Sequence, residues 1–133
     1  MASVPRLIVP GGTYYFRTEL ANAGSDLLVR RIDLLRVSIR LCMAHASFSI
    51  AAAVVLPSVL HMIWTLPDDD GDFPMRWRRI KSVFAHHCDE CAPWKRGYWE
   101  HLIRDPQDMA VHLSLMRDAP VSAGLVDHTT DWP

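Results

Sequence analysis

The longest apolar run of the chain covers residues 50–66 and reads IAAAVVLPSVLHMIWTL. It is shorter than the roughly 20 apolar residues that a membrane-spanning helix needs, and Pro57 and Ser58 interrupt it. A proline–serine pair between two runs rich in β-branched residues is typical of a tight turn. The run therefore predicts two short buried strands, residues 48–56 and 59–66, which pair as a hairpin, and it predicts no contact with a membrane.

The segments before this hairpin predict a strand and a helix. Residues 11–20 (GGTYYFRTEL) combine a glycine pair with aromatic and β-branched residues, which favour a strand. A helix is expected to start at Ser25 or Asp26, which are both good N-caps, and to run to about Ala46. Apolar residues recur in it at steps of three and four and form one face, made of Leu28, Ile32, Leu35, Ile39 and Cys42. Leu34, Val37 and Leu41 form a second apolar stripe on the other side of this helix. We expect it to contact a partner or to be partly buried within the monomer.

After the hairpin, the chain alternates between polar loops and helical patterns. We expect an acidic loop over residues 68–72, a helix over 73–87 and an irregular segment over 88–97. A strand or short helix over 98–104 and a further helix over 105–119 follow. Asp105 is the expected N-cap of the last helix, Pro106 suits its first turn, and Pro120 is expected to end it. This order predicts one α+β domain over residues 1–133, an antiparallel sheet with helices packed on it.

Charge and cysteine content narrow the class of protein. The formal net charge is −1, so the charge of the whole chain does not favour nucleic acid, and such a partner needs a local basic patch. Cys42, Cys88 and Cys91 are an odd number without a disulfide-like spacing, which favours a reducing cytoplasm. Residues 1–12 lack the charged and apolar regions of a secretory signal.

Residues 76–96 contain such a basic patch, because basic side chains outnumber acidic ones there and alternate with aromatic rings. Lysine and arginine neutralise phosphates, and aromatic rings stack on unpaired bases. We therefore predict a DNA-binding surface made of Arg76, Arg78, Arg79, Lys81, Trp94, Lys95, Arg96, Tyr98 and Trp99. The alternative is a solvated helix face beside tryptophans of the core.

Two motifs contain side chains that could hold a metal ion. The HHCDEC motif offers soft ligands that suit zinc, namely His86, His87, Cys88 and Cys91. A single cluster of this kind is weaker than the paired spacings of a zinc ribbon, and an unliganded loop is the alternative. In the predicted strand 59–66, His61 shares its face with Val59 and Ile63. No second ligand lies beside it, so a hydrogen-bonded structural histidine is the simpler interpretation.

Several stretches, in order along nearly the whole chain, resemble the REP-associated tyrosine transposases, which are single-tyrosine HUH transposases. They are VPGGTYYF (9–16), SDLLVRRIDLLR (25–36), VVLPSVLHMIWTLP (54–67), RWRRIKSVF (76–84), YWEHLIRDPQD (98–108), PVSAGLV (120–126) and DWP (131–133). The resemblance implies a ferredoxin-like antiparallel sheet with helices on one side. It also implies a divalent metal, Mg²⁺ or Mn²⁺, and a tyrosine nucleophile that cut and rejoin single-stranded DNA beside short imperfect hairpins.

Most of the catalytic groups that the resemblance implies are missing from this chain. The family's strand motif, roughly LPDHLHCIW, corresponds to LPSVLHMIW, so Val59 stands at the first histidine and His61 matches the second. The family's last helix, roughly DYIHYNPV, corresponds to SLMRDAPV, residues 114–121. Leu115 therefore stands at the nucleophilic tyrosine and Ala119 at an amide ligand of the metal. We expect no tightly bound divalent ion at His61. His101 also matches the family, without a role that the sequence reveals.

These substitutions predict a DNA-binding domain of a transposase family that has lost nuclease and strand-transfer activity and still binds single-stranded or hairpin DNA. Two alternatives stay open. One is a protein-interaction or assembly subunit, for example a homo-oligomer, that does not bind DNA. The other is an active enzyme in which Tyr15 or Tyr98 replaces the missing nucleophile. Family members usually continue with a polar and aromatic tail, so we expect that segment to be missing after residue 133.

Overall fold

The computed structural model describes residues 8–122. The elements follow in the order β1 (Thr13–Glu19), α1 (Leu27–Arg30), α2 (Ile32–His45), β2 (Ser49–Val55), β3 (Val59–Thr65), α3 (Phe73–His87), β4 (Trp99–Leu102) and α4 (Pro106–Ser122). Sequence predictions for residues 1–7 and 123–133, which include the end of the family resemblance, lie outside the described residues.

The predicted hairpin is present and belongs to a four-stranded antiparallel sheet with the strand order β2-β3-β1-β4. β2 and β3 are joined by a turn in which the Leu56 N–H donates to the Val59 carbonyl at 2.8 Å. β1 pairs with β3 on one side and with β4 on the other. This strand order, with helices after β1 and β3, is the ferredoxin-like arrangement. The predicted α+β fold is therefore confirmed, and the apolar run 50–66 forms two strands.

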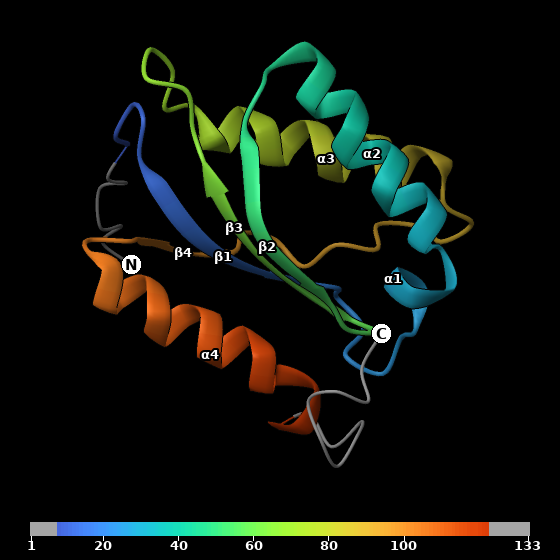
Figure 1. The fold of residues 1–133 in the computed structure, drawn as a ribbon. Helices are drawn as coiled ribbons and strands as arrows, with labels where there is room; N and C mark the ends of the chain where they lie inside the picture. The colour runs from blue at the N-terminus through green and yellow to red at the C-terminus, as the bar shows by residue number, and fades with distance from the viewer. Residues whose placement is uncertain (1–7, 123–133) are drawn as a thin grey trace, which may run out of the picture.

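One face of the sheet carries the main core. Side chains alternate along a strand, and every second side chain of β1 and β3 points to α2 and α3, which lie together on this side (Figure 1). Trp64 of β3 stacks on Trp77 of α3 with ring centroids 4.5 Å apart, and Phe16 of β1 contacts both rings. Each fully buried large apolar side chain stabilises a fold by about 1.5–3 kcal/mol, so this face contributes a large share of the stability.

Helix α4 covers the opposite face of the sheet (orange in Figure 1). Tyr15 of β1, Ile63 of β3 and Met116 of α4 form a second, smaller apolar cluster there. The expectation of helices on one side only was wrong. α4 follows β4 and packs on the second face because Met109 and Met116, seven residues apart, give it an apolar stripe.

The predicted helix from residue 25 to 46 is divided at Arg31 into α1 and α2. The single turn of α1 is held to the β2–β3 turn, where the Leu28 N–H donates to the Pro57 carbonyl at 3.1 Å. The predicted apolar face of the longer helix α2 is still directed inward, because Leu35 and Cys42 are buried.

Helix α4 begins as predicted but ends later. The Asp105 carboxylate accepts a hydrogen bond from the Asp108 N–H at 2.8 Å and caps the helix. Pro120 does not end the helix, which continues to Ser122. A proline lacks an N–H, so Pro120 removes one hydrogen bond of the helix, which ends two residues later at Ser122. Within residues 8–122, no helix is both long and apolar enough to cross a membrane.

Candidate functional site

His61 lies in the middle of β3, on the sheet face that α4 covers, and only 5% of its surface is exposed. Its Nδ1 is 2.7 Å from the hydroxyl of Tyr15 on the neighbouring strand β1. Burial, and to a lesser degree the positive charge of Arg17, lowers the pKa of His61 to about 4. The imidazole is therefore neutral at neutral pH.

Tyr15 serves as the hydrogen-bond partner of this imidazole. Burial raises the pKa of Tyr15 above its ordinary value, so its hydroxyl keeps its proton and can donate it to the neutral ring. A protonated phenol in the core is a poor nucleophile. The pair therefore has the geometry of the structural histidine that the sequence favoured.

Aliphatic residues occupy all the positions that the resemblance assigns to the missing catalytic groups. Val59 begins β3, two residues before His61 and on the same face. On α4, Leu115 is 47% exposed, whereas Ala119 is buried. Among residues 8–122, His61 belongs to no cluster of three metal-ligating side chains. The side chains present therefore do not fit a divalent ion at this position, and we derive no chemistry through one.

None of the three tyrosines of the chain offers an exposed hydroxyl beside His61. Tyr14 and Tyr15 are buried. Tyr98 is half-buried and packs edge-on against Phe16, in the core on the other face of the sheet. This arrangement argues against a relocated tyrosine nucleophile.

A polar cluster that the sequence analysis did not predict joins β4 to α4. The His101 Nε2 is 2.9 Å from Oδ2 of Asp108, and the His112 Nδ1 is 3.1 Å from Oδ1 of the same carboxylate. A hydrogen bond from the Arg104 N–H, together with His101, lowers the pKa of Asp108. The one local signal was the spacing of Asp108 and His112, which are four residues apart and so share a helix face.

The structure contradicts the place of Arg76 in the predicted DNA surface, because only 1% of this residue is exposed. Its guanidinium donates to the carbonyls of Asp72 and Ser47 at 3.0 and 2.8 Å. It also pairs with the Asp70 carboxylate at 3.1 Å. Arg76 therefore anchors the acidic loop to the helices and cannot reach a phosphate.

Three other residues of the predicted surface form a half-buried cluster. The Lys81 Nζ donates to the Gly97 carbonyl at 2.9 Å and lies over the rings of Trp94 and Tyr98. Burial lowers the pKa of Lys81 to about 8. These contacts tie α3 to the segment before β4, so we interpret this cluster as structural.

The other members of the predicted surface are exposed: Arg78, Arg79, Lys95, Arg96 and Trp99. Trp99, at 65%, is the most exposed large apolar side chain among residues 8–122. It pairs across the sheet with Arg17, which in turn pairs with His61, so these side chains share one face. The sequence analysis missed Arg17, although its alternation with Tyr15 indicated that both point the same way.

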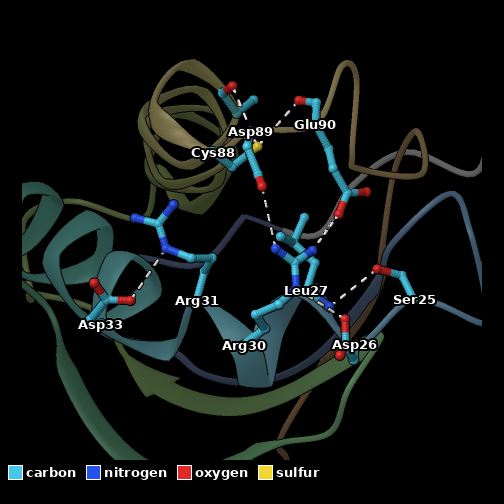
Figure 2. A network of polar contacts seen from close by, with 10 residues as sticks. Ser25, Asp26, Leu27, Arg30, Arg31, Asp33, Cys88, Asp89 and Glu90 are labelled. Atoms are coloured by element: carbon cyan, nitrogen blue, oxygen red, sulfur yellow. Dashed lines mark hydrogen bonds and ion pairs between the residues drawn. The ribbon is translucent and has the colours of Figure 1, made fainter.

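In the HHCDEC segment, the arrangement of the side chains favours the unliganded loop over the zinc site. Its candidate ligands do not converge in the part of the chain that the structure describes, and the Cys88 thiol lies against the carbonyls of Ala85 and Glu90. Figure 2 shows that Arg30 of α1 holds the acidic side chains of this segment. Its guanidinium contacts Glu90 at 2.7 Å and Asp89 at 3.4 Å.

Comparison with known proteins gives a consistent result. No protein-family model matches the chain. The chain is 40% identical over 133 residues to the REP-associated tyrosine transposase of Escherichia coli (strain K12), and the match covers 100% of this chain and 81% of that protein. It is 30% identical over 147 residues to a Haemophilus influenzae protein described by the same family name, covering 100% of this chain and 84% of that protein.

Two solved structures share the fold. One is a REP-associated tyrosine transposase bound to a REP hairpin, with a TM-score of 0.96, 40% identity, and coverage of 100% of this chain and 81% of that chain. The other, from Deinococcus radiodurans and described as a transposase, has a TM-score of 0.59, 14% identity, and coverage of 86% and 95%, and it supports the fold alone. From its full-length identity to the first two relatives, the chain belongs to the family of REP-associated tyrosine transposases.

Proposed function

We propose that this chain is a transposase-family domain that binds hairpin or single-stranded DNA and does not cut or rejoin it. One observation carries the proposal: three aliphatic residues occupy the catalytic positions of an otherwise retained fold. They are Val59, Leu115 and Ala119. The relative of the same fold that supports the choice of partner is bound to a REP hairpin.

Cleavage by the family's chemistry needs a hydroxyl that attacks phosphorus and a metal ion that neutralises the developing charge. Leu115 is exposed on α4 but carries no atom that can attack. His61 alone provides too few ligands, and its Nδ1 already contacts Tyr15. Catalytic groups that act as a unit are not additive, so the loss of even one of them removes most of the rate.

DNA binding needs only cations for the phosphates and an aromatic surface for unpaired bases. Trp99 offers such a surface on the face that carries His61, and the Arg17 side chain beside it is 41% exposed. Arg78, Arg79, Lys95 and Arg96 supply further exposed positive charge. Because Arg17 and Lys95 both lie within 4 Å of the Glu19 carboxylate, part of this positive charge is neutralised, and we expect weak binding.

The loss of cleavage is tested with a labelled hairpin oligonucleotide, with Mg²⁺ or Mn²⁺ present, followed by denaturing electrophoresis. We expect neither cleaved product nor a covalent adduct. A protein–DNA adduct formed by the unaltered chain would contradict the proposal, and Tyr15→Phe and Tyr98→Phe would then identify its source.

A gain-of-function variant makes this test sharper. The triple variant Val59→His, Leu115→Tyr and Ala119→Asn restores every group that the resemblance implies, and we expect it to form an adduct. The matched control carries Leu115→Phe with the same two other changes. It differs from the first by a single hydroxyl, and we expect no adduct from it.

DNA binding is tested by gel shift of hairpin and unstructured strands at two salt concentrations. We expect Trp99→Ala to weaken binding by about 1–3 kcal/mol, the range for one stacked base. Val111→Ala, on an exposed part of α4, is the control and should leave binding unchanged. Equal binding by both variants would remove Trp99 from the interface.

The assembly alternative has an observation of its own in the second apolar stripe of α2. Leu34 is buried, but Val37 and Leu41 are 45% and 54% exposed. If the chain binds no DNA at low salt and sediments as an oligomer that Leu41→Lys dissociates, the assembly function replaces the one proposed above.

A further inference from the structure

We propose that His101, Asp108 and His112 form a binding site for a divalent transition-metal ion of the zinc class. Each side chain offers one ligand atom, and these atoms all lie within 4.8 Å of one another. His101 comes from β4, and the other two residues come from α4. Two packed elements therefore direct their polar side chains to one point. The inference does not depend on whether the chain binds or cuts DNA.

The distances between the donor atoms suit a small tetrahedral ion. Zinc binds imidazole nitrogen and carboxylate oxygen at roughly 2.0–2.1 Å, which places neighbouring ligand atoms about 3.3 Å apart. The His101 Nε2 and Asp108 Oδ2 atoms are 2.9 Å apart, and the Asp108 Oδ1 and His112 Nδ1 atoms are 3.1 Å apart. These two separations, each to a different oxygen of Asp108, are within a few tenths of an ångström of that value, and the three ligand atoms lie within 4.8 Å of one another.

The backbone already fixes the orientation of these ligands. Asp108 and His112 are four residues apart, so both project from one face of α4. The Arg104 N–H donates to the Asp108 Oδ2 at 2.9 Å and holds the carboxylate in place. The His101 and His112 rings stack at 4.5 Å, and Tyr15 packs on His112 at 4.9 Å. The Arg104 hydrogen bond is the kind of supporting contact that orients a ligating carboxylate. The two imidazole planes are only 19° from parallel, so one ring turns when both bind the ion.

The donor set determines the class of ion. Two imidazoles and one carboxylate favour zinc and related transition ions over Mg²⁺ or Ca²⁺, which prefer oxygen. The Asp108 carboxylate balances one of the two positive charges. The side chains of His101, Asp108 and His112 are 26%, 17% and 16% exposed, so water can reach the ion and act as a fourth ligand.

Metal binding here replaces hydrogen bonds and moves protons in a defined way. The His112 Nδ1 lies 2.9 Å from the Asp108 carbonyl, a contact that needs a proton on that nitrogen. Ligation through Nδ1 places the remaining ring proton on Nε2, and ligation of His101 through Nε2 places its proton on Nδ1. Each imidazole binds the ion in its neutral form.

This site is separate from the position of His61. The hydroxyl of Tyr15 bonds to His61 while its ring packs on His112, so Tyr15 lies between the two histidines. His61 does not belong to the cluster of three ligands. The ion would join β4 to α4, and binding to the folded state alone would raise the melting temperature.

The test uses the untagged full chain with Cys88→Ser and Cys91→Ser, stripped of metal, and titrated with Zn²⁺ by calorimetry. We expect one ion per chain and a rise in Tm of roughly 5–10 °C at a hundredfold excess of free Zn²⁺ over Kd. His101→Phe and His112→Phe each keep a ring in the stack and remove the ligand. We expect each to weaken binding at least about tenfold.

Two control variants define where the ion binds. His87→Phe removes an exposed histidine of α3, and His61→Phe removes the histidine of β3; we expect both to bind Zn²⁺ as the parent does. The absence of stoichiometric binding would overturn the proposal, and so would binding that survives both His101→Phe and His112→Phe. Loss of binding in His61→Phe alone would also overturn it, because the ion would then sit at β3. If either ligand variant fails to fold without metal, the other decides.

Discussion

The two faces of the sheet differ in chemistry although the same strands build both. Toward α2 and α3, the strands present buried rings such as Phe16 and Trp64. Toward α4, they present hydrogen-bonding side chains, and Tyr15, His61 and His101 all point to this side. Residues adjacent in the sequence, such as Tyr15 and Phe16, therefore lie in different environments.

This difference explains how a chain can lose catalytic groups and keep its fold. Because side chains alternate strictly, a substitution on the α4 face such as that at Val59 leaves the packing toward α2 and α3 unchanged. The face toward α2 and α3 holds the larger buried cluster, so we expect it to contribute the larger share of the stability.

Phe16→Ala should be the most damaging substitution, because it removes a ring that contacts Trp64, Phe73 and Trp77. We expect a loss of about 3–5 kcal/mol in the free energy of unfolding, measured by urea denaturation. A decrease in the free energy of unfolding below about 1 kcal/mol would contradict the larger contribution of this face to the stability.

His61 should make the α4 face sensitive to acid. Its pKa is about 4 in the folded chain, against an ordinary value of 6.5. The unfolded chain therefore binds more protons than the folded chain between these values, and stability falls as pH falls from about 6.5 to about 4. The contribution is on the order of 3 kcal/mol, and it is complete above pH 6.5.

The measurement for this prediction is the free energy of unfolding against pH, for the unaltered chain and for His61→Gln. Subtracting the second curve removes the contributions of other groups, including Asp108. A difference that stays flat between pH 4 and 6.5 would show that His61 is already solvated in the folded chain.

Sequence patterns predicted the elements well where the signal was local. Pro57 and Ser58 marked the hairpin turn, and Asp105 marked the start of α4. Pro120 misled because the rule against proline inside a helix is weakest near the helix end. For Arg76, a better signal was available: it shares the buried helix face with Phe73 and Ile80, at the steps that a helix requires.

The candidate sites were predictable to different degrees. The aliphatic residues at positions 59, 115 and 119 are evident from the sequence once the family is known. The meeting of His101 with Asp108 and His112 is not, since it depends on how α4 packs on the sheet. The DNA surface stays a prediction, although burial removes Arg76 from it.

Arg76→Ala tests a buried charge beside the apolar core. It removes hydrogen bonds to the Asp72 and Ser47 carbonyls and the ion pair with Asp70. Because Asp70 is partly exposed and can be rehydrated, we expect a loss of about 2 kcal/mol in urea denaturation. Arg78→Ala, at an exposed position of the same helix, should cost less than about 0.5 kcal/mol. Similar losses in both variants would contradict the structural role of Arg76.

The smallest predicted effect compares two adjacent hydroxyls on opposite faces. Tyr15→Phe keeps the ring and leaves the buried His61 Nδ1 without its partner, so we expect a loss of about 1 kcal/mol or slightly more. In Tyr14→Phe, the lost partner is the Val9 N–H, which bonds the Tyr14 hydroxyl at 2.8 Å in a half-buried place. Water can replace that contact, so this variant should lose less.

The double variant Tyr15→Phe with His61→Phe completes a cycle that isolates the hydrogen bond between the two side chains. With both polar groups removed, the unpaired imidazole nitrogen of the Tyr15 variant is gone, so the double variant should lose less stability than the sum of the single variants. Additive losses would mean that the 2.7 Å contact between Tyr15 and His61 contributes nothing. The Tyr15 ring would then contribute through its packing with Ile63 and Met116.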